Sequence, residues 1–258
     1  SGYYSAAQST PTMMFPAVAL WLLYASFGGY NPTFIFMIAL GLAGALVCLP
    51  MARQLPPPDH RSPAQLSASP WWRQIISVSE RGVLLPAGLM FANQLSFPAL
   101  TGFIVLYARE IGITNISSYF IVSGITSVLA RPLLGRLSDR IGMGYSLVAT
   151  FVLQSLALLL LVFAANLAAI LLAGILYMLG MAVGGAATLV IAMKRATPQR
   201  RGRFMATFSV AYPLGYGIGA LITGWSVELL GYSWTYLFLA MLGSSGLFLT
   251  LAHWRHLD

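Results

Sequence analysis

The charged residues of this chain gather in short segments, and one of these segments, from Gly135 to Gly142, holds three charged side chains between two glycines. Its order, Gly-Arg-Leu-Ser-Asp-Arg-Ile-Gly, places the carboxylate of Asp139 close to the guanidinium groups of Arg136 and Arg140. The stretch lies between two apolar runs, and its glycines let the chain reverse tightly, so we expect a turn that joins two helices. Its chemistry would be ion pairing, and as a plain surface pair it would contribute about 0–1 kcal/mol.

Uncharged polar groups form the second candidate site, midway along an apolar run. Asn93, Gln94 and Ser96 occur together there, followed by Pro98. Amides within a membrane need hydrogen-bond partners, either on another helix or on a ligand in a wet cavity. The sequence leaves both readings open, so these three residues are candidate substrate contacts and candidate helix-packing groups.

Three tyrosines extend this candidate binding site. Tyr177, Tyr212 and Tyr216 lie in later apolar runs, and Tyr212 and Tyr216 are four residues apart, which places them on one helix face. Their rings and hydroxyls could contact an amphipathic ligand. Packing between helices is the alternative reading.

Signatures of enzymes, metal sites and cofactor sites are not found in the sequence. It has no H-E-x-x-H, G-x-S-x-G or Walker pattern, and His253-x-x-His256 sits in a basic tail. Glu110 and Glu228 fall at the ends of apolar runs, where interface residues are expected rather than proton carriers. We therefore predict no catalytic residue, no metal and no cofactor, and an enzyme acting on lipid is disfavoured because Asn93, Gln94 and Ser96 include no base or nucleophile pair.

Amino-acid composition indicates whether this protein folds in water or in a membrane. Charged residues are 8% and hydrophobic residues 58% of 258, and the mean hydropathy is +0.79, whereas soluble domains carry roughly 25% charged residues. One aqueous core could not bury that much apolar surface. The single cysteine, Cys48, excludes a disulfide framework within the chain. We predict an all-α integral membrane protein.

Apolar runs of about 20 residues mark transmembrane helices. The sequence contains about eight, at residues 7–27, 32–52, 83–108, 116–135, 144–164, 167–194, 203–229 and 232–254. Turn residues separate several of them, for example Gly28–Pro32 and Gly231. Spacings of the type Gly-x-x-x-Gly, at Gly215–Gly219 and Gly180–Gly184, predict smooth ridges for close helix packing.

The basic residues give the orientation. If the chain alternates through eight spans, every arginine and lysine except Arg109 falls on one side. By the positive-inside rule that side is cytoplasmic, together with both termini. The net charge of +8 is then explained by topology and contact with membrane lipids, and no nucleic-acid partner is expected.

The charged segment also resembles a known signature. Gly135, Asp139, Arg140 and Gly142 match the loop G-x-x-x-D-[RK]-x-G-[RK]-[RK] of the major facilitator superfamily, although Met143 and Gly144 replace the final basic pair. In that family the loop, here including Arg136, acts as a conformational switch. The resemblance implies that Asp139 docks on the N-terminus of a helix in the opposite bundle, here near residues 2–7.

An internal similarity sets the register of this resemblance. The region from residue 201 onward matches the region from residue 1 at an offset of about 200 residues, as expected of the family's two repeated six-helix bundles. The implied division is 1–52 as helices 5 and 6, 53–82 as a cytoplasmic linker rich in proline, and 83–258 as helices 7 to 12. Helices 1 to 4 would be missing from this sequence.

The functional prediction is a secondary active transporter working by alternating access. The stretch Arg131–Arg140 looks like bacterial drug- and sugar-efflux members, so we expect efflux of a small organic solute by proton antiport, from a monomer in the inner (plasma) membrane. The alternative is a truncated or non-transporting membrane protein that needs a partner polypeptide.

Overall fold

The computed structural model describes residues 18, 30–54, 81–196 and 201–254 of the chain. These residues contain helices and no strand. The helices are α2 (Tyr30–Gln54), α4 (Arg81–Leu95), the π-helical segment η2 (Ala99–Phe103), α5 (Ile104–Glu110), α6 (Ser117–Ile141), α7 (Met143–Val162), α8 (Leu167–Arg195) and α9 (Arg201–Ala252). The predicted all-α class is confirmed.

Long apolar helices dominate the described part of the chain. Five stretches are long and apolar enough to cross a membrane, and the last, Phe204–Ala252, has 49 residues. A single crossing needs about 20 residues, and the backbone of α9 breaks at Gly231, where φ is 77°. Two crossings therefore lie in α9, as the sequence predicts. Helix α2 coincides with the expected span 32–52, whereas the span expected at 7–27 lies outside the described residues.

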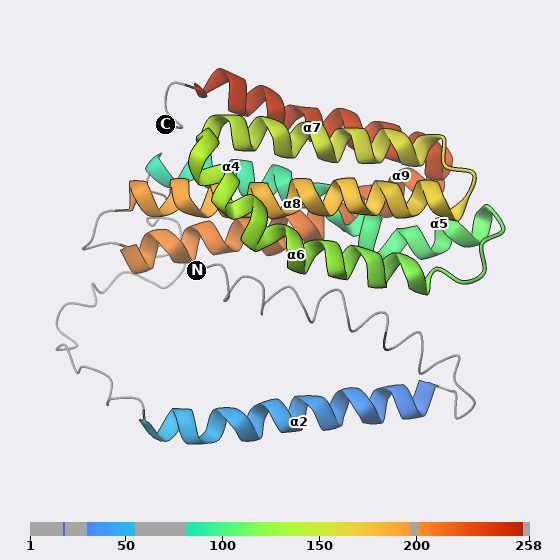
Figure 1. The fold of residues 1–258 in the computed structure, drawn as a ribbon, viewed down its shortest axis with the longest axis horizontal. Helices are drawn as coiled ribbons and strands as arrows, with labels where there is room; N and C mark the ends of the chain where they lie inside the picture. Colours follow the sequence, from blue (N-terminus) through green and yellow to red (C-terminus); the bar gives the residue numbers. More distant parts are fainter. Residues whose placement is uncertain (1–17, 19–29, 55–80, 197–200, 255–258) are drawn as a thin grey trace.

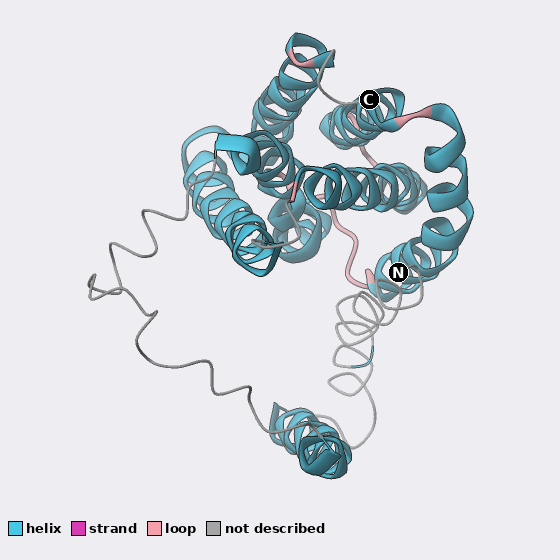
Figure 2. Cartoon of the chain, turned by 90° about the vertical axis from the view of Figure 1, so that its left-hand side faces the viewer, coloured by secondary structure: helices cyan, strands magenta, loops and turns pink. Residues whose placement is uncertain are grey.

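Helices α4 to α9 run side by side as one bundle, and both views place α2 apart from it (Figures 1 and 2). Helix α8 packs against α7, α6 and α4, and α4 also packs against α9. The most buried of these five spans are Gly82–Glu110 and Leu167–Arg195, where more than half of the most apolar 18-residue window is buried. These two spans form the interior of the bundle and carry most of the candidate binding residues.

The bundle presents apolar side chains to its surroundings. Leu133, Phe163, Leu221 and Phe248 are each more than 60% exposed on α6, α9 and the end of α7. Such a surface is unstable in water and suits the hydrocarbon interior of a bilayer. The predicted division into 1–52, 53–82 and 83–258 stays a prediction, because most of the linker lies outside the described residues.

Candidate functional site

The candidate site begins at an irregularity in the span that runs from Gly82 to Glu110. The α-helix is interrupted at Ser96, and a π-helical segment follows at Ala99–Phe103. Pro98 explains the interruption, because its nitrogen carries no hydrogen for the helical ladder and its ring crowds the preceding turn. The Thr101 hydroxyl donates to the carbonyl oxygen of Phe97 at 3.2 Å. The polar residues Asn93 to Ser96 thus flank a break in the middle of a membrane span.

Ser96 forms a buried hydrogen bond across to α8. Its hydroxyl oxygen lies 2.8 Å from the hydroxyl oxygen of Tyr177. The ring of Tyr177 stacks on Phe97 with 6.3 Å between centroids, and Tyr216 meets Phe97 edge-on at 5.9 Å. The Tyr216 hydroxyl lies 3.2 Å from that of Thr101. The structure therefore brings together Ser96, Tyr177 and Tyr216, and we call this group, with Phe97 and Thr101, the polar-aromatic seam.

The seam has a buried side and an open side. Ser96 and Tyr177 are 3% and 0% exposed, whereas Tyr216 is 37% exposed. Tyr212, one turn earlier on α9, is 41% exposed. In this conformation Tyr212 and Tyr216 of α9 can contact a ligand directly. Ser96 and Tyr177 lie on the buried side of the seam, where the ring of Tyr177 stacks on Phe97.

Asn93 connects its span to α7. Its side-chain oxygen accepts a hydrogen bond of 2.7 Å from the amide nitrogen of Gln154. Both residues are almost fully buried. Sequence reasoning missed Gln154 because its span is otherwise strongly apolar, although a lone amide in such a span is itself a signal for a buried partner.

Two buried polar atoms of neighbouring residues have no hydrogen-bond partner among the described residues. They are the Asn93 side-chain nitrogen and the Gln94 side-chain oxygen. Gln94 also packs closely against Gly215 of α9. Buried polar groups are almost always satisfied in folded proteins. Asn93 and Gln94 can therefore bind a ligand or a water molecule through these two atoms, in addition to packing between helices.

Formal charge is kept at the ends of the bundle. Glu110 and Glu228 are both exposed; Glu110 is the last residue of α5, and Glu228 lies three residues before the break of α9 at Gly231. The last turn of α8 carries Lys194 and Arg195. The seam contains no acidic or basic residue type. The seam can recognise shape, aromatic surface and hydroxyl groups, but it offers no countercharge.

The segment Gly135–Gly142 differs from the expected turn. Helix α6 continues through Ile141, and the reversal falls on Gly142 alone, where φ is 99°. That conformation strongly favours glycine. Ser138 donates to the hydroxyl of Ser146 at 2.7 Å, and Ser146 donates to the carbonyl oxygen of Gly142 at 2.8 Å, so the two helix ends are tied together. The helix persists because residues 136–141 include neither glycine nor proline.

The docking partner proposed for this segment lies outside the described residues. The side chains of Arg136 and Asp139 and the helix start at residues 2–7 are among those not described. The role of Gly135, Arg136, Asp139, Arg140 and Gly142 as a conformational switch therefore stays a prediction.

Comparison with known proteins identifies one family. A family model described as Major Facilitator Superfamily matches residues 1–193 and residues 87–257 of the chain. Together the two matches extend over nearly the whole sequence. No curated protein matches the chain.

Proposed function

Because this chain belongs to the major facilitator superfamily of membrane transporters, we propose that it exports a small organic solute by alternating access, in exchange for protons. Transport across a membrane follows from the family. Efflux, proton coupling and the nature of the solute are our inferences.

The polar-aromatic seam carries the proposal for the solute. It crosses three helices at an irregular point of a membrane span and contains hydroxyls and rings without formal charge. Such a surface suits lipophilic or weakly polar compounds, since a phosphorylated anion would lose its hydration without gaining a countercharge. Tyr212 and Tyr216 would contact the solute, and Ser96 and Tyr177 would position the ring of Phe97.

Efflux and proton antiport rest on the likeness of Arg131–Arg140 to bacterial drug- and sugar-efflux members. The described spans carry no acidic residue at mid-depth, because Glu110 and Glu228 lie at their ends. A coupling carboxylate is therefore expected outside the described spans. We also propose that the transporter is a monomer in the inner membrane with both termini in the cytoplasm.

Transport by paired tyrosine variants tests the binding role. Energised inside-out vesicles would be offered a panel of neutral and weakly polar fluorescent solutes, with and without a protonophore. Loss of the Tyr216 ring in Tyr216→Ala should raise KM at least about fivefold, since an aromatic contact contributes about 1 kcal/mol beyond its buried area. Tyr177→Phe, which removes only the bond to Ser96, should raise KM less.

Matched controls lie elsewhere in the bundle. Tyr145 is 60% exposed and packs on Trp254 away from the seam, so Tyr145→Ala should leave KM unchanged. Tyr107 is a buried tyrosine whose hydroxyl donates to the carbonyl oxygens of Leu161 and Ala164, so Tyr107→Phe controls for Tyr177→Phe. Equal KM values for seam and control variants would refute the binding role, and accumulation unaffected by the protonophore would refute proton coupling.

A further inference from the structure

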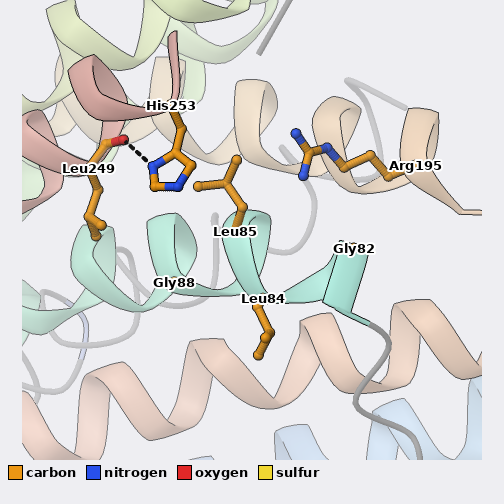
Figure 3. A pocket seen from close by; sticks show the side chains of 7 residues that line it. All are labelled: Gly82, Leu84, Leu85, Gly88, Arg195, Leu249 and His253. Atoms are coloured by element: carbon orange, nitrogen blue, oxygen red, sulfur yellow. Dashed lines mark hydrogen bonds between the residues drawn. The ribbon is translucent and has the colours of Figure 1, made fainter. Parts of the chain in front are cut away.

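An open groove lies at the end of the bundle that carries the last turn of α8. Its volume is about 690 Å³, and it lies between the start of α4, the end of α8 and the end of α9 (Figure 3). Its lining residues are Gly82, Leu84, Leu85, Gly88, Arg195, Leu249 and His253. The groove is separate from the polar-aromatic seam, whose residues do not line it.

The lining combines an apolar floor with two basic groups. Leu85 and Leu249 line the floor, and Figure 3 shows the imidazole of His253 above Leu85, with Arg195 coming from the neighbouring helix. The His253 Nδ1 atom lies 3.2 Å from the carbonyl oxygen of Leu249, which fixes the ring. None of the seven lining residues is acidic.

The ends of two candidate membrane spans place this groove at the expected depth of lipid headgroups. Gly82 is the first residue of one membrane span and Arg195 is the last residue of another. Lys194 is exposed beside Arg195, and helix α4 begins at Arg81. Leu84, at the rim, is 58% exposed. Basic pockets between transmembrane helices at this depth are suited to anionic phospholipids.

We propose that this groove binds a phospholipid with an anionic headgroup. The phosphate would contact Arg195 and His253, and the upper part of one acyl chain would cover Leu85. A soluble phosphate would match the two basic groups but would leave the apolar floor uncovered, so the lining favours a lipid. The site concerns the transporter's lipid partner and is independent of its solute and direction.

Gly88 offers a direct way to fill the groove. A Cβ atom built at Gly88 meets no atom of another described element within 4 Å, so a larger side chain can enter the open space without displacing a described neighbour. Gly217 on α9 is also helical with nothing within 4 Å of its Cβ position, and it does not line the groove. Gly88→Leu and Gly217→Leu are therefore a matched pair.

Native mass spectrometry of the purified full chain can test the site. The delipidated protein would be offered equal amounts of phosphatidylglycerol and phosphatidylcholine, and retained lipid would be counted. We expect a preference for phosphatidylglycerol, a loss of about fivefold in its binding for Arg195→Gln or His253→Gln, and a loss of about tenfold for Gly88→Leu, which occupies the site. Gly217→Leu should behave as the parent chain.

Other results would overturn the proposal. Equal retention of the two lipids would remove the charge recognition, and displacement by equimolar inorganic phosphate would assign the site to a soluble anion. Unchanged binding in Gly88→Leu would place the lipid elsewhere on the basic end. Each variant would first be checked for monodisperse elution; if Arg195→Gln does not fold, His253→Gln and Gly88→Leu decide the question.

Discussion

Single polar residues inside this bundle act in pairs across helices. The amide of Gln154 on α7 donates to Asn93 on α4, and Ser96 on the same span meets Tyr177 on α8. Interhelical hydrogen bonds in membranes contribute about 0.6–2 kcal/mol each, and a buried group that loses its partner costs about 1–3 kcal/mol. Each pair therefore fixes the register of two helices as well as shaping a site.

The Asn93–Gln154 pair gives a stability prediction. Gln154→Leu should lower the free energy of unfolding by about 1–3 kcal/mol, because it leaves the Asn93 oxygen buried without a donor. The double variant Asn93→Leu with Gln154→Leu should lose less than the sum of the two single variants, since both polar groups are then gone. Thermal unfolding in detergent measures these changes, and strictly additive losses would show that the two amides do not interact.

The sequence predicts which residues are polar and buried, but not which residues they meet. Asn93, Gln94 and Ser96 are conspicuous because they interrupt an apolar run, and their need for partners follows from solvation alone. The partner of Asn93 lies 61 residues away in the chain. That pairing depends on how α4 and α7 cross, which no local pattern contains.

At the scale of helices, glycines determine how closely α4 and α9 approach. A Cβ atom at Gly215 would lie 2.7 Å from the carbonyl oxygen of Phe91, and one at Gly219 would overlap that of Leu95. The predicted ridge Gly215–Gly219 is therefore the contact surface for α4. This contact also places Tyr216 beside Phe97.

Alanine scanning of this ridge should separate packing from helix propensity. Gly219→Ala should destabilise the bundle by about 1–3 kcal/mol, because the obstructing atom is backbone and cannot move aside. Gly217→Ala, with nothing within 4 Å, should be neutral or stabilising by about 0.5 kcal/mol. Thermal unfolding of both variants in the same detergent checks this. Equal stabilities would mean that α4 and α9 are not in close contact at Gly219.

Helix positions were largely predictable, and helix ends less so. Span length follows from bilayer thickness, so hydropathy finds α6 to α9 within a few residues. The span expected at 116–135 agrees with the apolar stretch Ser117–Gly135, but helix α6 itself continues to Ile141, through the segment where two glycines and three charges predict a turn. Charged residues are compatible with a helix, and within residues 135–142 only Gly142 adopts a backbone angle that ends it.

At the scale of the whole molecule, charge divides the bundle into two ends. Four helix ends gather at the left in Figure 1: the start of α4, the ends of α6 and α8, and the start of α9. These helix ends carry the basic residues Arg81, Arg140, Lys194, Arg195 and Arg201. Arg109 lies at the opposite end with Glu110. The sequence predicted this asymmetry because alternation through the membrane depends only on the order of spans. The groove at the basic end was not predictable, since residues 82–88 and 249–253 meet only in the fold.

Orientation in the membrane can be measured with single cysteines introduced into a chain from which the native cysteine has been removed. Cys48 is the single cysteine, so Cys48→Ser gives a background without thiols. Thr114, in the connection before α6, and Lys194, near the end of α8, are both exposed and lie at opposite ends of the bundle. In intact cells an impermeant maleimide should label Thr114→Cys and leave Lys194→Cys unlabelled, because the positive-inside rule keeps the basic end in the cytoplasm.

Inside-out vesicles should reverse this labelling pattern, and permeabilised cells should label both cysteines equally, which controls for thiol reactivity. Labelling of Lys194→Cys in intact cells would place the basic end outside. The proposed lipid groove would then face the outer leaflet. The efflux direction proposed from Arg131–Arg140 would lose its support, because it assumes that the basic end lies in the cytoplasm. Labelling of both variants in intact cells would indicate a mixed orientation, which a charge difference this large between the two ends should prevent.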